Sequence, residues 1–412
     1  MILEIIKELK NNYMNKFGHI SYDSSDGCCI SRWVEELNDE KYIDIFKNVS
    51  LKQKGDYVII KYLDFEVIFS RDSSVSYSKF WNMYGGVYRE CRGIVIDVVN
   101  EVVVLKPYTK FFNINEVPDT QENIIKQKLN RAKKVEFSNK LDGSLVSARY
   151  YNGEFFVASS GMLEDSIIVK FANKVIKGDV NYQNLLKDFA DYTLIFESIN
   201  IDDLKVVVYT PDQFGLYLTG IRNMKTDELL SYKEVISIAK QYGVRSTEQY
   251  LVNFSEIMAM KKDYKSSEKE GFVMNLDGEL VKIKCDDYLL FSKMAKNNCS
   301  PNSIVKALYF GRLDDLMASV DASFIPVINN VVDTIHKYCF IMNKVTLELM
   351  EKAPKERPEF FKWLKSQPKE LSRYLSSIYL GRSFSFLAIV ESNESTKFVK
   401  FSDMQKVIDN YK

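Results

Sequence analysis

The chain has 412 residues, which is too long for one ordinary hydrophobic core and predicts two or three domains. Hydrophobic residues make up 46% and charged residues 27%, and this balance excludes a disordered or fibrous protein. The net charge is zero overall, but residues 291–412 contain 18 Lys and Arg against 13 Asp and Glu. This local excess fits a nucleic-acid partner and fits solvated helix faces equally well.

The N-terminal segment is not expected to be a signal peptide. Residues 1–8 alternate apolar and charged side chains with helical spacing, and they lack the basic start and apolar core of a signal peptide. No apolar run reaches the roughly 18 residues that a membrane helix needs. The six cysteines show no C-x-x-C spacing, which argues against structural zinc. The sequence therefore predicts a cytoplasmic protein without a membrane partner.

Residues 55–290 are rich in strand signals, because short runs of Val, Ile, Tyr and Phe alternate with Gly, Asn and Asp. The dipeptides Asn152-Gly153 and Asp277-Gly278 are strong hairpin signals. Four antiparallel hairpins are predicted: 57–62 with 65–69, 92–97 with 101–105, and one around each of these dipeptides.

Beyond Ser300 the apolar residues recur with helical spacing, and we expect helices over 324–351, 358–366 and 369–380. We place the domain boundary near residues 288–300. The sequence predicts an α+β fold, with antiparallel sheets and helices in residues 1–290 and an all-helical domain in residues 291–412.

The most informative stretch is a K-x-D-G-S sequence that begins at Lys140. A lysine attacks phosphorus only as the free amine, and its ordinary pKa of about 10.4 leaves little amine at neutral pH. Positive neighbours disfavour the ammonium form. We therefore expect other cations close to Lys140.

Suitable neighbours lie in a later hairpin, where Glu270 precedes one strand and Lys282 and Lys284 lie on the next. Side chains alternate along a strand, so both lysines project to the same face. Glu197 ends an apolar strand, and a buried glutamate is rare unless it is paired or binds a ligand. A single K-x-K is common on solvated strands, but its combination with Lys140 and Glu270 indicates one site.

The order of these motifs resembles that of the covalent nucleotidyltransferases, which comprise ATP-dependent ligases and mRNA capping enzymes. K-x-D-G, F-E, E-G-F-V-M and V-K-I-K are similar to their motifs I, III, IV and V. Two upstream elements, E-C-R-G at 90–93 and K-F-F-N at 110–113, resemble the phage-type RNA ligase 1 family. The resemblance covers residues 88–290. It implies a nucleotidyltransferase fold, the ATP-grasp-like ligase domain of antiparallel sheets and helices.

The resemblance implies an ATP-dependent RNA ligase that joins 5′-phosphate and 3′-hydroxyl ends through lysyl-AMP and RNA-adenylate. ATP and Mg²⁺ or Mn²⁺ are the expected cofactors. Lys140 would be the adenylated nucleophile, Glu270 the catalytic metal ligand, and Glu197 a ligand of the ribose or metal. The remaining residues expected to bind the nucleotide are Arg92, Lys110, Asp142, Gly143, Lys282 and Lys284, and the last two are also expected to be catalytic because they would hold the α-phosphate. The strand 217–222 is expected to supply an aromatic ring for adenine.

The family's helical C-terminal domain is linked to RNA specificity, including repair of broken tRNA. Nicked tRNA and an end-healing polynucleotide kinase/phosphatase are accordingly expected partners. One departure concerns Ser159-Ser160-Gly161, where relatives carry a basic residue before the glycine. Either another basic residue such as Arg149 or Lys170 substitutes, or the RNA 5′-phosphate is held differently.

Two other functions remain open. A capping-type guanylyltransferase would carry GMP on the same lysine, although the E-C-R-G and K-F-F-N elements argue against it. A non-catalytic RNA-binding module would have a degenerate pocket, although Lys140, Lys282 and Lys284 are all present.

Overall fold

The computed structural model divides the chain into two compact units, Met1–Tyr288 and Leu289–Lys412. The division falls within the predicted boundary region, inside helix α12 (Asp286–Lys296). In the described part of the chain, no helix has the length and apolar character needed to span a bilayer. The structure describes residues 1–64, 67–68, 75–203, 205–296, 300–311, 313–320, 324–382, 384–390 and 396–411.

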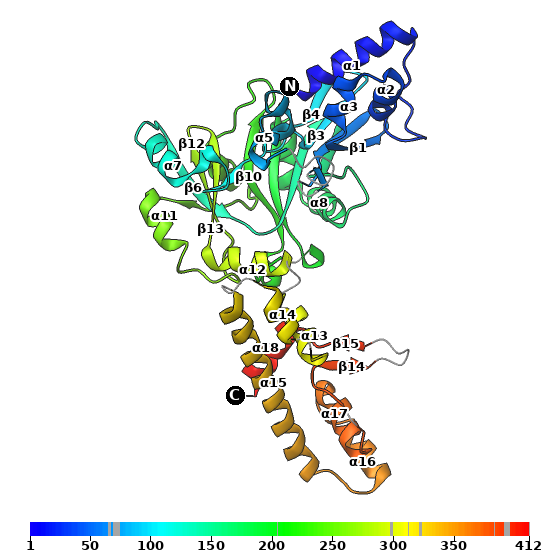
Figure 1. Cartoon of the computed structure of the whole chain (residues 1–412), viewed down its shortest axis with the longest axis vertical. Helices are drawn as coiled ribbons and strands as arrows, with labels where there is room; N and C mark the ends of the chain where they lie inside the picture. Colours follow the sequence, from blue (N-terminus) through cyan, green and yellow to red (C-terminus); the bar gives the residue numbers. More distant parts are fainter. Residues whose placement is uncertain are drawn as a thin grey trace. The chain divides into compact units, whose positions relative to one another are not determined.

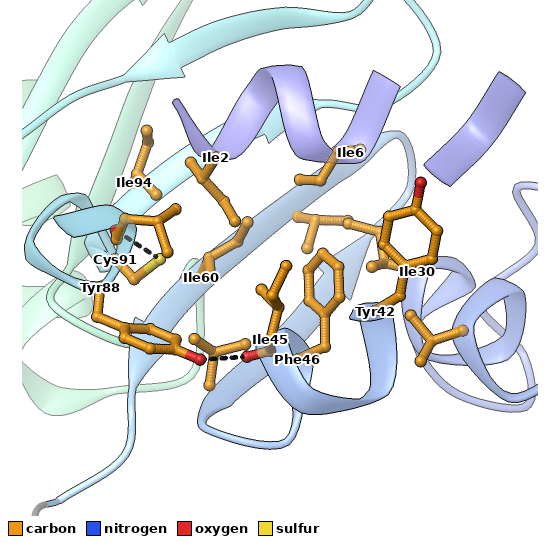
Figure 2. Packing of buried hydrophobic residues seen from close by; sticks show 14 of the residues in the cluster. Ile2, Ile6, Ile30, Tyr42, Ile45, Phe46, Ile60, Tyr88, Cys91 and Ile94 are labelled. Atoms are coloured by element: carbon orange, nitrogen blue, oxygen red, sulfur yellow. Dashed lines mark hydrogen bonds between the residues drawn. The ribbon is translucent and has the colours of Figure 1, made fainter. Parts of the chain in front are cut away.

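The first sheet of the N-terminal unit is antiparallel, with the strand order β1-β2-β3-β4. Helix α1 (Ile2–Phe17) packs against it through apolar residues on one face, and Figure 2 shows Ile2 pointing toward Ile60, with Ile94 beside it in the same cluster. The strands are β1 (Val49–Lys54), β2 (Tyr57–Tyr62), β3 (Arg92–Asp97) and β4 (Val102–Leu105). The other helical segments around this sheet are α2 (Cys29–Leu37), α3 (Glu40–Phe46), α5 (Tyr77–Phe80), η1 (Met83–Gly86) and α6 (Val87–Glu90).

The second sheet is antiparallel in the order β10-β9-β7-β8, and it shares a core with three helices. Its strands are β7 (Ser144–Tyr151), β8 (Glu154–Ser159), β9 (Tyr192–Ile199) and β10 (Gly215–Asn223). The helices are α8 (Ile167–Gly178), α9 (Val180–Asp188) and α10 (Tyr232–Tyr242).

The third sheet has the order β11-β6-β12-β13-β5, and only the β13–β5 pair is parallel. Its strands are β5 (Phe112–Asn113), β6 (Val135–Lys140), β11 (Gln249–Tyr250), β12 (Gly271–Leu276) and β13 (Glu279–Lys284). Helices α7 (Glu122–Leu129) and α11 (Phe254–Met260) contribute to its core. Short 3-10 turns lie between strands of the same sheet: η2 (Pro118–Thr120) follows β5, and η3 (Ile201–Asp203) and η4 (Pro211–Gln213) lie between β9 and β10.

Three of the predicted hairpins are confirmed: β3–β4, β7–β8 and β12–β13. Asn152 and Asp277 both have positive φ, as do the glycines that follow them, which is the geometry of a tight type I′ turn. The remaining predicted hairpin, 57–62 with 65–69, is wrong for the residues that the structure describes. Val67 and Ile68 are helical, β2 forms its hairpin with the preceding β1, and Phe65, Glu66 and Phe69 lie outside the described residues.

The C-terminal unit is built mainly of helices (Figure 1). The three predicted helices are confirmed as α15 (Ile325–Glu351), α16 (Arg357–Leu364) and α17 (Lys369–Tyr379). The unit is not all-helical, because β14 (Ala388–Val390) and β15 (Thr396–Phe398) form a small antiparallel hairpin. The other helices are α13 (Pro301–Tyr309), α14 (Leu313–Ser319) and α18 (Phe401–Asn410).

Candidate active site

Lys140 lies where two sheets meet. It is the last residue of β6 in the third sheet, and the chain passes through Leu141-Asp142-Gly143 before β7 begins in the second sheet. Gly143 packs so closely on β9 that an added Cβ would lie 2.4 Å from the carbonyl oxygen of Ser198. A side chain at this position would therefore separate the strands that hold the motif.

The third sheet brings the predicted catalytic residues to one end. Strand β12 lies between β6 and β13, and Gly271 is opposite both Lys140 and Lys284. Glu270 immediately precedes Gly271, so its carboxylate lies between the two lysines. Lys140 Nζ is 2.6 Å from one carboxylate oxygen of Glu270, and Lys284 Nζ is 2.8 Å from the other.

A cavity of about 410 Å³ opens over this arrangement. The predicted residues that line it are Arg92, Lys140, Gly143, Glu197, Glu270, Lys282 and Lys284. Four aromatic residues that lacked a predicted role also line it: Tyr62, Tyr108, Phe111 and Tyr232. Phe111 belongs to the K-F-F-N element, so this motif could have predicted that Phe111 lies at the site.

Family comparison connects this cavity with RNA ligation. The model described as RNA ligase, of the phage T4 RNA ligase 1 type, matches residues 90–297, half of the chain. The chain belongs to this RNA ligase family. The matched residues contain Lys140, Glu197, Glu270, Lys282 and Lys284.

Two curated relatives have ligase names. The chain is 24% identical over 251 residues to a putative bifunctional polynucleotide kinase/RNA ligase of Autographa californica nuclear polyhedrosis virus, covering 56% of this chain and 34% of the relative. It is 25% identical over 246 residues to a putative RNA ligase of Thermovibrio ammonificans, covering 56% of this chain and 61% of the relative. The chain thus spans about a third of one relative and three fifths of the other. A solved Naegleria gruberi RNA ligase with ATP and Mn is 20% identical with a TM-score of 0.35, over 44% of this chain and 56% of that one.

The protonation of Lys140 differs from the sequence-based expectation. Burial by itself lowers the pKa of Lys140, but the carboxylates of Glu270 and Glu197 outweigh it and raise the pKa above the ordinary value. Conversely, burial opposes ionisation of Glu270, yet Lys140 and Lys284 hold its pKa below the ordinary range. The prediction that nearby cations lower the pKa of Lys140 is therefore wrong for this structure, in which Lys140 is paired with Glu270.

Lys282, which lines the same cavity, is a lysine whose pKa is lowered. Burial, followed by the charges of Arg92 and Lys110, lowers the pKa of Lys282 well below its ordinary value. Its ammonium lies 4.6 Å from the centre of the Phe111 ring, and the Arg92 guanidinium lies 5.3 Å from the same ring. Arg92 also has a buried Nη1 without a partner among the described residues. These cations form an electrostatic site for an anionic group.

Glu197 lines the same cavity as Arg92 and Lys282. Burial raises its pKa to about 7, and the repulsion of Glu270 adds to the effect while Lys140 opposes it. The Gly143 amide donates a hydrogen bond of 3.1 Å to Glu197 Oε1. The described residues contain no cluster of three or more His, Cys, Asp or Glu that could hold a metal. The carboxylates that line the cavity are those of Asp64, Glu197 and Glu270.

Two predicted nucleotide-binding residues lie outside the cavity lining. The Asp142 carboxylate accepts hydrogen bonds from the Val206 and Val207 amides, at 2.9 and 3.0 Å, and from Tyr288 Oη at 2.8 Å. With only 6% of its surface exposed, Asp142 fixes the motif to neighbouring segments. Lys110 lines the adjoining cavity of about 1280 Å³, which shares Phe111 with the first.

The neutral Ser159-Ser160-Gly161 segment has a basic neighbour that the sequence did not single out. Ser160 lines the cavity, and so does Lys61 from β2. A Cβ on Gly161 would lie 3.0 Å from Lys61 Cδ, so the two residues are in close contact. Arg149 instead donates to the Ala190 carbonyl, and Lys170 pairs with Asp165. Neither of the two expected substitutes lines the cavity.

The strand expected to provide an aromatic ring for adenine contributes Thr219 to the cavity. Tyr217 points elsewhere, since its hydroxyl donates to the Gln213 carbonyl and the Arg245 guanidinium lies 5.6 Å from its ring. The alternation of side chains along β10 puts residues 217 and 219 on one face, but a bulge between Leu218 and Gly220 breaks the pattern.

Proposed function

We propose that this chain is an ATP-dependent RNA ligase that forms a covalent AMP adduct on Lys140 and then uses it to join RNA ends. The observation that carries the proposal is the arrangement of Lys140, Glu270 and Lys284 at the end of three adjacent strands. Membership of the RNA ligase family supports the same chemistry, and both curated relatives are ligases by name.

The residues of the cavity fit a nucleotide. Arg92, Lys282 and Lys284 provide three cations for the phosphates, and the unpartnered Nη1 of Arg92 is a donor that a phosphate oxygen would satisfy. Aromatic side chains provide apolar surface for a base, as in other ligand pockets.

The residues also fit a divalent cation that arrives with ATP. Mg²⁺ commonly binds one or two carboxylates together with substrate phosphates, and Glu270 and Glu197 line the cavity together with a third carboxylate, Asp64. When bound there, Mg²⁺ or Mn²⁺ would neutralise phosphate charge. The Naegleria relative was solved with ATP and Mn.

The proposed reaction has three displacements at phosphorus. Lys140 Nζ, after losing a proton, forms a bond to the α-phosphorus of ATP while the bond to pyrophosphate breaks. An oxygen of the RNA 5′-phosphate then attacks the same phosphorus and displaces Lys140. Finally, an RNA 3′-hydroxyl loses its proton and attacks the 5′-phosphate, forming a phosphodiester bond and releasing AMP. The cations of the cavity stabilise the charge that develops on phosphate in each step.

We propose that Lys61 supplies the basic charge missing from Ser159-Ser160-Gly161. Its contact with Gly161 and its place in the cavity lining support a role with the RNA 5′-phosphate. A lysine on a different strand can provide this charge because the first and second sheets approach each other at this point. Gly93 of β3 likewise lies close to Ser160.

We propose that the RNA is a broken structured molecule such as nicked tRNA, sealed in the cytoplasm. A polynucleotide kinase/phosphatase would leave the required 5′-phosphate and 3′-hydroxyl. The viral relative supports such a partner, because its name combines polynucleotide kinase and RNA ligase.

Incubation with radiolabelled nucleotides followed by RNA tests this function. Labelled ATP should give labelled protein, and adding RNA with a 5′-phosphate and 3′-hydroxyl should remove the label and yield joined RNA. Labelling by GTP in place of ATP would favour a capping-type guanylyltransferase. RNA binding without labelling by either nucleotide would favour a non-catalytic module.

A further inference from the structure

The excess positive charge of the C-terminal unit is confined to one segment. Residues 352–382, which we call the arm, contain eight Lys and Arg against three Glu. The rest of residues 291–412 contains ten basic and ten acidic residues. The arm comprises α16, α17 and the loops beside them, and it follows the end of the long helix α15 (Figure 1).

The described basic side chains of the arm are exposed to solvent without carboxylate partners among the described residues. Seven of the eight are described, and all seven are exposed. None of these seven forms an ion pair with a described carboxylate, whereas Lys344 and Lys406 elsewhere in the unit each have one. The seven residues are Lys352, Lys355, Arg357, Lys362, Lys365, Arg373 and Arg382. Unpaired cations held at this density repel one another, and an anionic partner would relieve that repulsion.

The arm is also held in a defined shape. Phe360 is buried and stacks on Tyr379 with ring centres 3.8 Å apart, while Tyr379 Oη donates to the Lys355 carbonyl at 2.9 Å. Leu371 and Leu375 of α17 pack into the core of the unit. The cations therefore lie on a fixed helical framework, which reduces the entropy cost of binding a partner.

The chemistry of the surface favours nucleic acid over a membrane. Helices that bind membranes in the interface insert an exposed apolar face beside their basic one. None of the exposed large hydrophobic residues described in the unit lies within 352–382. Exposed Lys and Arg without such a face suit the phosphate backbone of RNA, to which they contribute binding through release of counterions.

We propose that the arm is a binding surface for the phosphate backbone of the RNA substrate. This inference rests on the proposed function, because it takes RNA to be the substrate. It assigns backbone contacts to the arm, and attack on ATP to the N-terminal unit.

The test measures binding of the full-length chain to a nicked stem–loop RNA, without ATP, at a series of salt concentrations. One variant removes four charges from the arm: Lys355→Gln, Lys362→Gln, Lys365→Gln and Arg373→Gln. A matched control removes four exposed charges elsewhere in the unit: Lys337→Gln, Lys344→Gln, Lys400→Gln and Lys406→Gln. Thermal melting checks that both variants fold, and lysyl-AMP formation is measured separately.

The arm variant should bind the RNA at least tenfold more weakly at low salt. Its slope of log affinity against log salt should become shallower by about 0.7–0.9 for each RNA phosphate that the variant no longer neutralises. The control variant should keep the wild-type RNA affinity and the wild-type salt slope. Lysyl-AMP formation should be normal in both variants. Unchanged RNA affinity in the arm variant, or an equal loss in the control, would overturn the proposal. Failure of the proposed function itself has a different signature, since the wild type would then form no lysyl-AMP.

Discussion

Lys140 and Glu270 form a buried ion pair, which raises the pKa of Lys140 and holds this proposed nucleophile in its unreactive ammonium form. The sequence indicated which cations surround Lys140, because K-x-D-G and V-K-I-K are recognisable patterns. It could not show that Glu270 binds both Lys140 and Lys284, since that contact depends on the register of three strands. The protonation state follows from this contact and not from the number of nearby lysines.

Replacing either Lys282 or Lys284 by alanine should suppress lysyl-AMP formation while leaving the fold intact. Each substitution removes a cation from the phosphate site, for which we expect a decrease in rate on the order of 10²-fold or more. The melting temperature should not fall for Lys282→Ala, because burial of this cation is unfavourable. Single-turnover labelling with ATP and thermal melting measure the two effects. A large drop in melting temperature with retained labelling would instead mark these lysines as structural.

Lys61→Ala should impair the transfer of AMP to RNA more strongly than it impairs the formation of lysyl-AMP. The reason is that Lys61 contacts Gly161 at the cavity wall, whereas Lys140 pairs with Glu270. Lys170→Ala is the matched control, because Lys170 is exposed and pairs with Asp165. Equal losses in the two steps, or an equal effect of the control, would remove Lys61 from the proposed 5′-phosphate site.

At the scale of elements, local signals predicted the turns better than the strand partners. Asn-Gly and Asp-Gly dipeptides require positive φ and so specified two hairpins from sequence alone. The partners of β2 and the β14–β15 hairpin depend on contacts between distant or short segments, which periodicity does not encode. Asp142 shows the same limit, because its carboxylate binds backbone amides more than 60 residues away.

The close packing of β7 on β9 predicts that Gly143→Ala is damaging. An added methyl group would clash with Ser198 O and with Glu197 Cγ, 2.4 and 3.0 Å away. Such overpacking typically costs about 1–3 kcal/mol, and here it also displaces Glu197. Gly178→Ala in α8 is the control, because no atom lies within 4 Å of its Cβ position. Urea unfolding should show a decrease in stability for Gly143→Ala alone, and equal stability of the two variants would contradict the tight packing.

At the scale of the whole molecule, nucleotide chemistry and RNA choice should be separable. The residues of the cavity around Lys140 all precede Tyr288, where the N-terminal unit ends. A chain ending at Ser300 should therefore form lysyl-AMP at the full-length rate. It should lose the preference for a nicked tRNA-like stem–loop over an unstructured RNA. If the folded, shortened chain keeps the full-length preference, the C-terminal unit has another role and the tRNA-repair proposal fails.

The central claim is that Lys140 carries AMP, and intact-mass measurement after incubation with ATP and Mg²⁺ tests it most directly. The wild-type mass should increase by one AMP, and peptide mapping should place the modification on Lys140. Lys140→Ala, with an unchanged melting temperature, should remain unmodified. An unmodified wild-type protein, or a variant that still gains AMP, would contradict the account.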